Sequence, residues 1–148
     1  MRRACKFPIL ALGLMLVACG PVFDTARFKT DFALGVAAYD AGDYQAAAAY
    51  WQPLAARYDL AAMRNMGNLH RQGLGVEKDP QKALAYYEAA AKRGFAPAQY
   101  GAAMMYLGNH GVAYNGEKAV IWLTRAAQNG FEPAKAQLKR LQKPRQPF

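Results

Sequence analysis

The chain of 148 residues contains no serine, and its only cysteines are Cys5 and Cys19. The missing serine excludes acyl-transfer chemistry of the Ser-His-Asp and Ser-Lys types, including the Ser-x-x-Lys arrangement of β-lactamases. The three threonines have no arrangement of His or Lys around them that would activate a hydroxyl as a nucleophile. We therefore expect that the chain is not an enzyme.

Histidine is also scarce, since only His70 and His110 occur. Neither stands beside a cluster of carboxylates, and two isolated histidines make a poor metal site. The stretch Gly73-Leu74-Gly75 does not form a phosphate loop, because it lacks the GxxxxGK[ST] spacing and follows no predicted strand. The sequence therefore predicts no metal, no cofactor and no small-molecule substrate.

Acidic residues are few: 10 Asp and Glu stand against 19 Lys and Arg, which gives a net charge of +9. Several of the basic residues lie near the carboxyl end, and residues 142–148, which include two prolines, are expected to be a disordered basic tail. Lys and Arg near anionic lipid are attracted to it by about 1 kcal/mol each, so this end is one candidate membrane contact. A solvated cap is the competing interpretation. No nucleic-acid-binding motif is present, and no nucleic-acid partner is expected.

The amino-terminal residues have the pattern of an export signal. Three basic residues precede an apolar run, Phe7–Val17, and eleven residues are too few to span a bilayer as an ordinary helix. The end of this run, Leu16-Val17-Ala18-Cys19, resembles the lipobox of bacterial lipoproteins. The resemblance implies that residues 1–18 are removed, that Cys19 is lipidated, and that residues 19–30 form a tether.

The residue after Cys19 is Gly20 and not aspartate. By resemblance to bacterial lipoprotein sorting, this implies an anchor in the outer membrane, with the protein facing the periplasm. A mature chain that begins at Cys19 has one cysteine and can form no internal disulfide. Its fold must therefore be stabilised by helix packing.

Most of the remaining chain is a tandem repeat of one sequence unit. Residues 62–97 align without a gap on residues 98–133, a shift of 36 positions, and ten pairs are identical. The identical residues are mostly small, apolar or glycine, which are the types used at packing positions and turns. A repeat of this length is typical of a solenoid, in which neighbouring units complete one another's core. An aromatic set at equivalent repeat positions, such as Trp51 and Tyr87, is expected in that core.

Each unit reads as two helices. Asp79 can accept hydrogen bonds from the first turn of the second helix, Pro80 suits its first position, and Asn115 has the same role one repeat later. Gly94 and Gly130 follow the last turn, where a left-handed residue is often required. The first helix of the unit is expected over 60–72, and its copy over 97–107. Residues 31–61 read as a divergent first repeat, and 134–141 as a capping helix.

The pattern Ala62-x3-Met66-Gly67-x2-His70, followed by Gly73-x-Gly75-Val76 and Asp79-x2-Lys82-Ala83, resembles the Sel-one-like repeat. That family is related to the tetratricopeptide repeat but has a longer loop between its helices. The resemblance implies an all-α fold: an α/α solenoid of three helix pairs over 31–61, 62–97 and 98–133, followed by the cap. It also places His70 at a core position and Gly75 with Gly111 in turns between helices.

In tetratricopeptide-like stacks the first helix of each pair lines the concave face. Removing the packing positions from these helices leaves residues that share another face. In the second repeat these residues are polar and basic, and in the repeats on either side they are apolar or aromatic. The expected groove consists of Phe32, Val36, Tyr39, Arg64, Asn68, Arg71, Tyr100, Met104 and Leu107. Packing between neighbouring helices is the competing interpretation for Phe32, Tyr39 and Leu107.

The function that the resemblance implies is a lipid-anchored scaffold or adaptor that binds another envelope protein. A second hypothesis is binding of an anionic envelope polymer, such as peptidoglycan or an acidic polysaccharide. Added salt should weaken polymer binding through Lys and Arg far more than an apolar contact in a groove.

Overall fold

The computed structural model describes residues 25–108 and 110–142. The predictions about the signal sequence, the lipid on Cys19 and the tail over 143–148 lie outside these ranges. Within them the chain forms seven helices and no strand. These are α1 (Thr25–Asp40), α2 (Tyr44–Ala56), α3 (Leu60–Gln72), α4 (Pro80–Lys92), α5 (Ala96–Leu107), α6 (Gly116–Gln128) and α7 (Glu132–Gln142).

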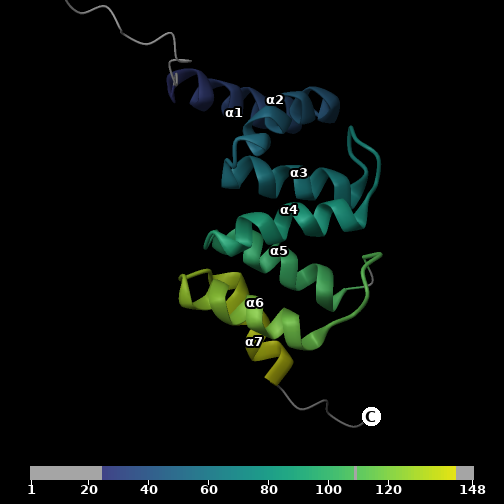
Figure 1. Cartoon of the computed structure of the whole chain (residues 1–148), viewed down its shortest axis with the longest axis vertical. Helices are drawn as coiled ribbons and strands as arrows, with labels where there is room; N and C mark the ends of the chain where they lie inside the picture. The colour runs from purple at the N-terminus through teal and green to yellow at the C-terminus, as the bar shows by residue number, and fades with distance from the viewer. Residues whose placement is uncertain (1–24, 109, 143–148) are drawn as a thin grey trace, which may run out of the picture.

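The helices stack in chain order, from α1 at one end to α7 at the other (Figure 1). Within the pairs α1–α2, α3–α4 and α5–α6 the two helices pack on each other, and each pair packs on the next, while α7 covers α6. This confirms the predicted solenoid of three helix pairs with a carboxyl-terminal cap. Within the described residues, no helix combines the length and the apolar character needed to cross a membrane.

Side-chain caps begin four of these helices. Asp43, Asp59, Asp79 and Asn115 each accept a hydrogen bond from the backbone N–H three residues later, at 2.7–3.0 Å. Each bond satisfies one of the donors that a helix start leaves without a partner. Gly94 and Gly130 have φ of +87° and +80° after the last turns of α4 and α6, as predicted from the repeat.

A large side chain on the second helix of a pair meets a small residue on the first. A Cβ atom on Gly67 would lie 2.8 Å from the ring of Tyr87, and one on Gly35 would overlap the Trp51 ring. The corresponding pair in the third repeat is Ala103 and Leu123, both fully buried. The aromatic positions of the repeat are therefore core positions, as expected.

The long loop of each repeat folds back on the pair before it. Gly75 (φ +66°) has no room for a Cβ atom because the backbone of Tyr44, at the start of α2, lies against it. Gly111 (φ +78°) lies against the side chain of Pro80, at the start of α4. Tyr44 and Pro80 are 36 residues apart, so both loops make one repeated contact. This confirms that these glycines belong to turns between helices.

Two predicted boundaries differ from the structure. Helix α1 begins at Thr25, so residues 25–30 are helical and do not belong to a tether. The reason is that Phe28, four residues before Phe32, packs against the core and extends the apolar face of the helix by one turn. At the other end, the capping helix α7 is longer than predicted and runs from Glu132 to Gln142.

Candidate protein-binding groove

Two cavities lie on the face formed by the first helices of the three pairs. The first, of about 310 Å³, is lined by Val36, Tyr39, Trp51, Arg64, Asn65 and Asn68. The second, of about 300 Å³, is lined by Arg64, Asn68, Arg71, Tyr87, Pro97, Tyr100, Gly101, Met104 and His110. Arg64 and Asn68 line both, so the two cavities are neighbours on either side of these α3 side chains. We call the residues of both cavities together the groove.

The structure brings together seven of the nine residues predicted for this face. Phe32 and Leu107 line neither cavity. The Phe32 ring tilts against Trp51 at 6.2 Å and borders a separate hollow with Phe28 and Lys29. Leu107 is half-buried against the core. Both residues pack against the core, which agrees with the competing interpretation of packing between helices. Tyr39 does both, since it lines the groove and packs edge-on against Tyr44 at 5.1 Å.

Tyr87 forms the floor of the second cavity, and the sequence-based prediction did not include it. The Cδ1 and Cε1 atoms of its ring lie close to both Gly67 of α3 and Gly101 of α5. Its hydroxyl donates a hydrogen bond of 2.6 Å to Oδ1 of Asn68, which fixes that amide where the two cavities meet. Burial raises the pKa of Tyr87, while the positive charges of Arg71 and Arg64 act in the opposite direction.

The groove is electropositive. Its described lining contains Arg64 and Arg71 but no aspartate or glutamate. Within residues 25–108 and 110–142, neither arginine forms a salt bridge, and Arg64 donates only to the neighbouring Asn65 amide oxygen, at 3.2 Å. A guanidinium group can bind a carboxylate through two parallel hydrogen bonds. The groove can therefore hold a carboxylate between apolar and aromatic walls.

His70 lies behind this face and not in it. The side chain is 5 % exposed, Nδ1 is 3.0 Å from the carbonyl oxygen of Glu77, and the ring stacks on Tyr86 at 5.8 Å. It is the hydrogen-bonded packing residue that the repeat pattern predicts. Among the described residues, no three His, Cys, Asp or Glu side chains come close enough together to hold a metal ion.

The repeats match a known family of helical repeats. Residues 60–95 and 96–131 each match the model of the Sel1 repeat, with the period of 36 found in the sequence. A search of the curated proteins found no match. Together with the solved structures below, these matches support the Sel1-like repeat family.

Two solved structures resemble the chain. The Sel1 repeat protein from Oxalobacter formigenes is 32% identical, with a TM-score of 0.69 over 75% of this chain and 44% of that one. The protein c5321, a protective antigen present in uropathogenic Escherichia coli strains and displaying an SLR fold, is 26% identical, with a TM-score of 0.71 over 77% of this chain and 25% of that one. The present chain therefore spans less than half the length of either structure.

Proposed function

Because residues 60–131 are two Sel1 repeats, and proteins built from such repeats are generally scaffolds for protein–protein interaction, we propose that this chain binds another protein through its groove. The observation that carries the proposal is the junction of the two cavities at Arg64 and Asn68. The two neighbouring cavities together are lined by residues of α1, α3 and α5. The chain acts in this proposal as a scaffold and not as an enzyme.

The chemistry of the lining defines the partner segment. Tyr39 with Trp51 on one side, and Tyr100 with Met104 on the other, suit apolar or aromatic side chains. Between them, Arg64 and Arg71 suit an acidic side chain. Arg, Tyr and Met are residue types enriched at protein interfaces. The expected occupant is an extended segment of an envelope protein that carries a carboxylate flanked by apolar residues.

The lipobox resemblance supplies the location in this proposal. A lipidated Cys19 anchors the protein in the outer membrane, facing the periplasm. Two or more acyl chains give stable anchoring, whereas one chain gives only marginal binding. Fractionation of cells that express Cys19→Ala is expected to find the protein released from the membrane. Membrane-bound Cys19→Ala, or mature wild-type protein with an unmodified Cys19, would refute the anchor.

A crosslinking experiment tests the groove. A photoreactive residue at Met104 should crosslink the partner in intact cells, whereas the same residue at Lys82, which lies on α4 and lines neither cavity, should not. Arg64→Glu with Arg71→Glu should preserve helicity in circular dichroism and abolish the Met104 crosslink. The matched control is Lys139→Glu with Arg140→Glu on α7, which should leave the crosslink unchanged.

Three outcomes contradict the proposal. A crosslink that survives reversal of both groove charges but disappears with the α7 variant assigns binding to the basic end. Equal crosslink yields from photoreactive residues at the positions of Lys82 and Met104 would show that the partner's contact is not confined to the groove. Crosslinked envelope polymer instead of protein, lost on addition of salt, supports the second hypothesis of an anionic polymer ligand.

A further inference from the structure

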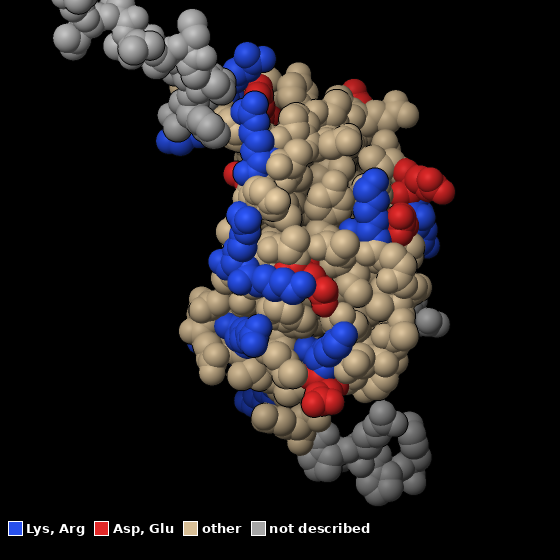
Figure 2. Space-filling view, viewed as in Figure 1, with Lys and Arg blue, Asp and Glu red and all other residues tan. Residues whose placement is uncertain are grey.

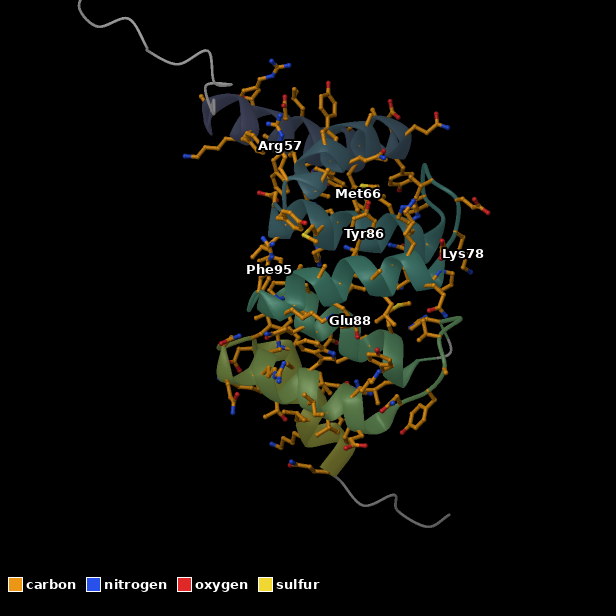
Figure 3. The ribbon with its side chains drawn as sticks, in the orientation of Figure 1. Arg57, Met66, Lys78, Tyr86, Glu88 and Phe95 are labelled. Atoms are coloured by element: carbon orange, nitrogen blue, oxygen red, sulfur yellow. The ribbon has the colours of Figure 1, made fainter. Side chains whose placement is uncertain are left out.

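The two long edges of the solenoid differ. The turns that join one helix pair to the next, at residues 57–59, 93–95 and 129–131, lie along one edge, which we call the turn edge. The loops inside the pairs lie along the opposite edge, which we call the loop edge (Figure 1). Arg57 and Phe95 lie on the turn edge and Lys78 on the loop edge (Figure 3).

On the turn edge a repeated position contacts residues earlier in the chain, within its own pair for Arg57 and at the preceding turn for Arg93 and Asn129. The Arg57 guanidinium lies over the Phe28 ring, 5.0 Å from its centre. Thirty-six residues later, the Arg93 guanidinium lies 4.0 Å from the centre of the Tyr58 ring. Asn129, a further 36 residues on, donates from Nδ2 to the carbonyl oxygen of Gly94 at 3.2 Å. The two arginines are exposed, so stacking holds their guanidinium planes in place at the surface.

Tyr58 has a backbone conformation that its side chain disfavours. Its φ is +64°, and it is the only described residue other than glycine with a positive φ. The equivalent residues of the next two turns are Gly94 and Gly130. A bulky residue in the left-handed region destabilises the fold relative to glycine, and such outliers gather at functional surfaces. The Tyr58 side chain is nonetheless 58% exposed, so burial in the core does not account for it.

Charge is distributed unequally between the edges. Acidic residues near the turn edge have partners: Asp31 pairs with Arg27, Glu132 pairs with Lys135, and Asp59 caps α3. The loop edge carries five acidic residues, of which Asp43 and Asp79 also cap helices, against four basic ones: Asp40, Asp43, Glu77, Asp79 and Glu117 against Arg71, Lys78, Lys82 and Lys118. Figure 2 shows Lys and Arg side chains following one another along the side of the turn edge.

We propose that the turn edge binds the anionic headgroups of a phospholipid membrane and holds the solenoid with its length along the lipid surface. Stacked guanidinium groups present donors that match phosphate oxygens, and the exposed Tyr58 ring is of the amphipathic type that sits at headgroup level. Lys and Arg close to anionic lipid are attracted to it.

The chain before α1 supports lipid as the occupant. Helix α1 starts at the turn edge, because its other end, Asp40, leads into the loop edge. Five residues separate Cys19 from Thr25, and such a segment spans at most about 20 Å when fully extended. A lipid on Cys19, which is the anchor proposed above, therefore brings the turn edge to the membrane before any other surface.

Hydrogen–deuterium exchange of the full-length protein, reconstituted in vesicles, tests this proposal. With phosphatidylglycerol in the vesicles, amides in 56–60 and 92–96 should exchange several-fold more slowly than in pure phosphatidylcholine, and amides in 73–79 should not change. Arg57→Gln with Arg93→Gln should remove this protection. The matched control on the loop edge, Lys78→Gln with Lys82→Gln, should keep it.

A second variant separates a surface role from a structural one. Tyr58→Gly removes the side chain that disfavours the left-handed conformation, so the unfolding midpoint should not fall. The protection of turn-edge amides by phosphatidylglycerol should nevertheless weaken. Four results overturn the proposal: no protection by phosphatidylglycerol, equal protection of both edges, protection that survives the double arginine variant, or protection by polyglutamate in solution but not by vesicles. Fractionation of Cys19→Ala remains a separate measurement, and the phosphatidylglycerol dependence is expected with or without the acyl chains.

Discussion

Substituting Gly67 with alanine places a methyl group against the ring of Tyr87. The new Cβ atom would lie 2.8 Å from Cε1 and 3.0 Å from Cδ1. The ring has little freedom to move, because Gly101 of α5 also lies close to its Cδ1 and Cε1 atoms and because the hydroxyl is bonded to Asn68. Overpacking of this kind costs about 1–3 kcal/mol. Alanine gains about 0.5–1 kcal/mol over glycine within a helix. We therefore expect Gly67→Ala to lower the free energy of unfolding by about 0.5–2 kcal/mol, and Gly67→Leu by more.

Urea unfolding followed by far-ultraviolet circular dichroism measures this change. Ala85→Gly, on the exposed face of α4, is the control that measures the helix penalty of glycine without a steric contact. Adding that penalty to the result for Gly67→Ala isolates the steric contribution at the ring.

The third repeat supplies the compensating change, since Ala103 and Leu123 occupy the positions of Gly67 and Tyr87. Tyr87→Leu alone should be destabilising because it leaves a cavity and deprives Asn68 of its donor. In the double variant Gly67→Ala with Tyr87→Leu, the methyl group fills part of that cavity. We expect a favourable coupling free energy of about 1 kcal/mol between the two sites. Additive effects, or a stable Gly67→Leu variant, would refute the size match between α3 and α4.

Two further predictions concern the loops and the third pair. Gly75→Ala should be strongly destabilising in thermal unfolding, because it combines a positive φ with a clash against the Tyr44 backbone. The control is Gly94→Ala, which has a positive φ but would meet no atom within 4 Å, and it should lower the free energy of unfolding by only about 1–2 kcal/mol. Equal effects of the two substitutions would contradict the packing of the loop against α2. In the third pair, burial and the hydrogen bond to Glu88 (2.7 Å) raise the pKa of Tyr106 to about 12, from an ordinary value of 10.0. The protonated phenol is thus favoured by folding, so its contribution to stability is complete below about pH 10 and is lost as the pH rises through about 12. Absorbance titration should show this late ionisation, and Glu88→Gln should move it towards 10, whereas Glu77→Gln in the exposed loop should leave it unchanged.

Local chemistry in the sequence determined the repeat, the helix starts and the packing positions. A cap acts within three residues of its own position, so Asp79 and Asn115 could be recognised from the chain alone. The recurrence of small residues at a shift of 36 located the positions where helices pack. The first turn of α1 was missed although Asp24, directly before it in the sequence, is of a type preferred at helix starts. In the structure Phe28 of this turn packs on the core.

The tertiary structure decided which of the remaining residues form a surface. The spacing along each first helix placed Arg64, Asn68 and Arg71 on one face, but whether neighbouring faces align depends on the rotation between successive pairs. In the structure Phe32 and Leu107 are half-buried against the core, and the groove is lined by Tyr87, a residue of the second helix that a search of first helices could not find. The contact of Arg93 with Tyr58 joins residues 35 positions apart in the chain, so it exists only because two turns meet when the pairs stack.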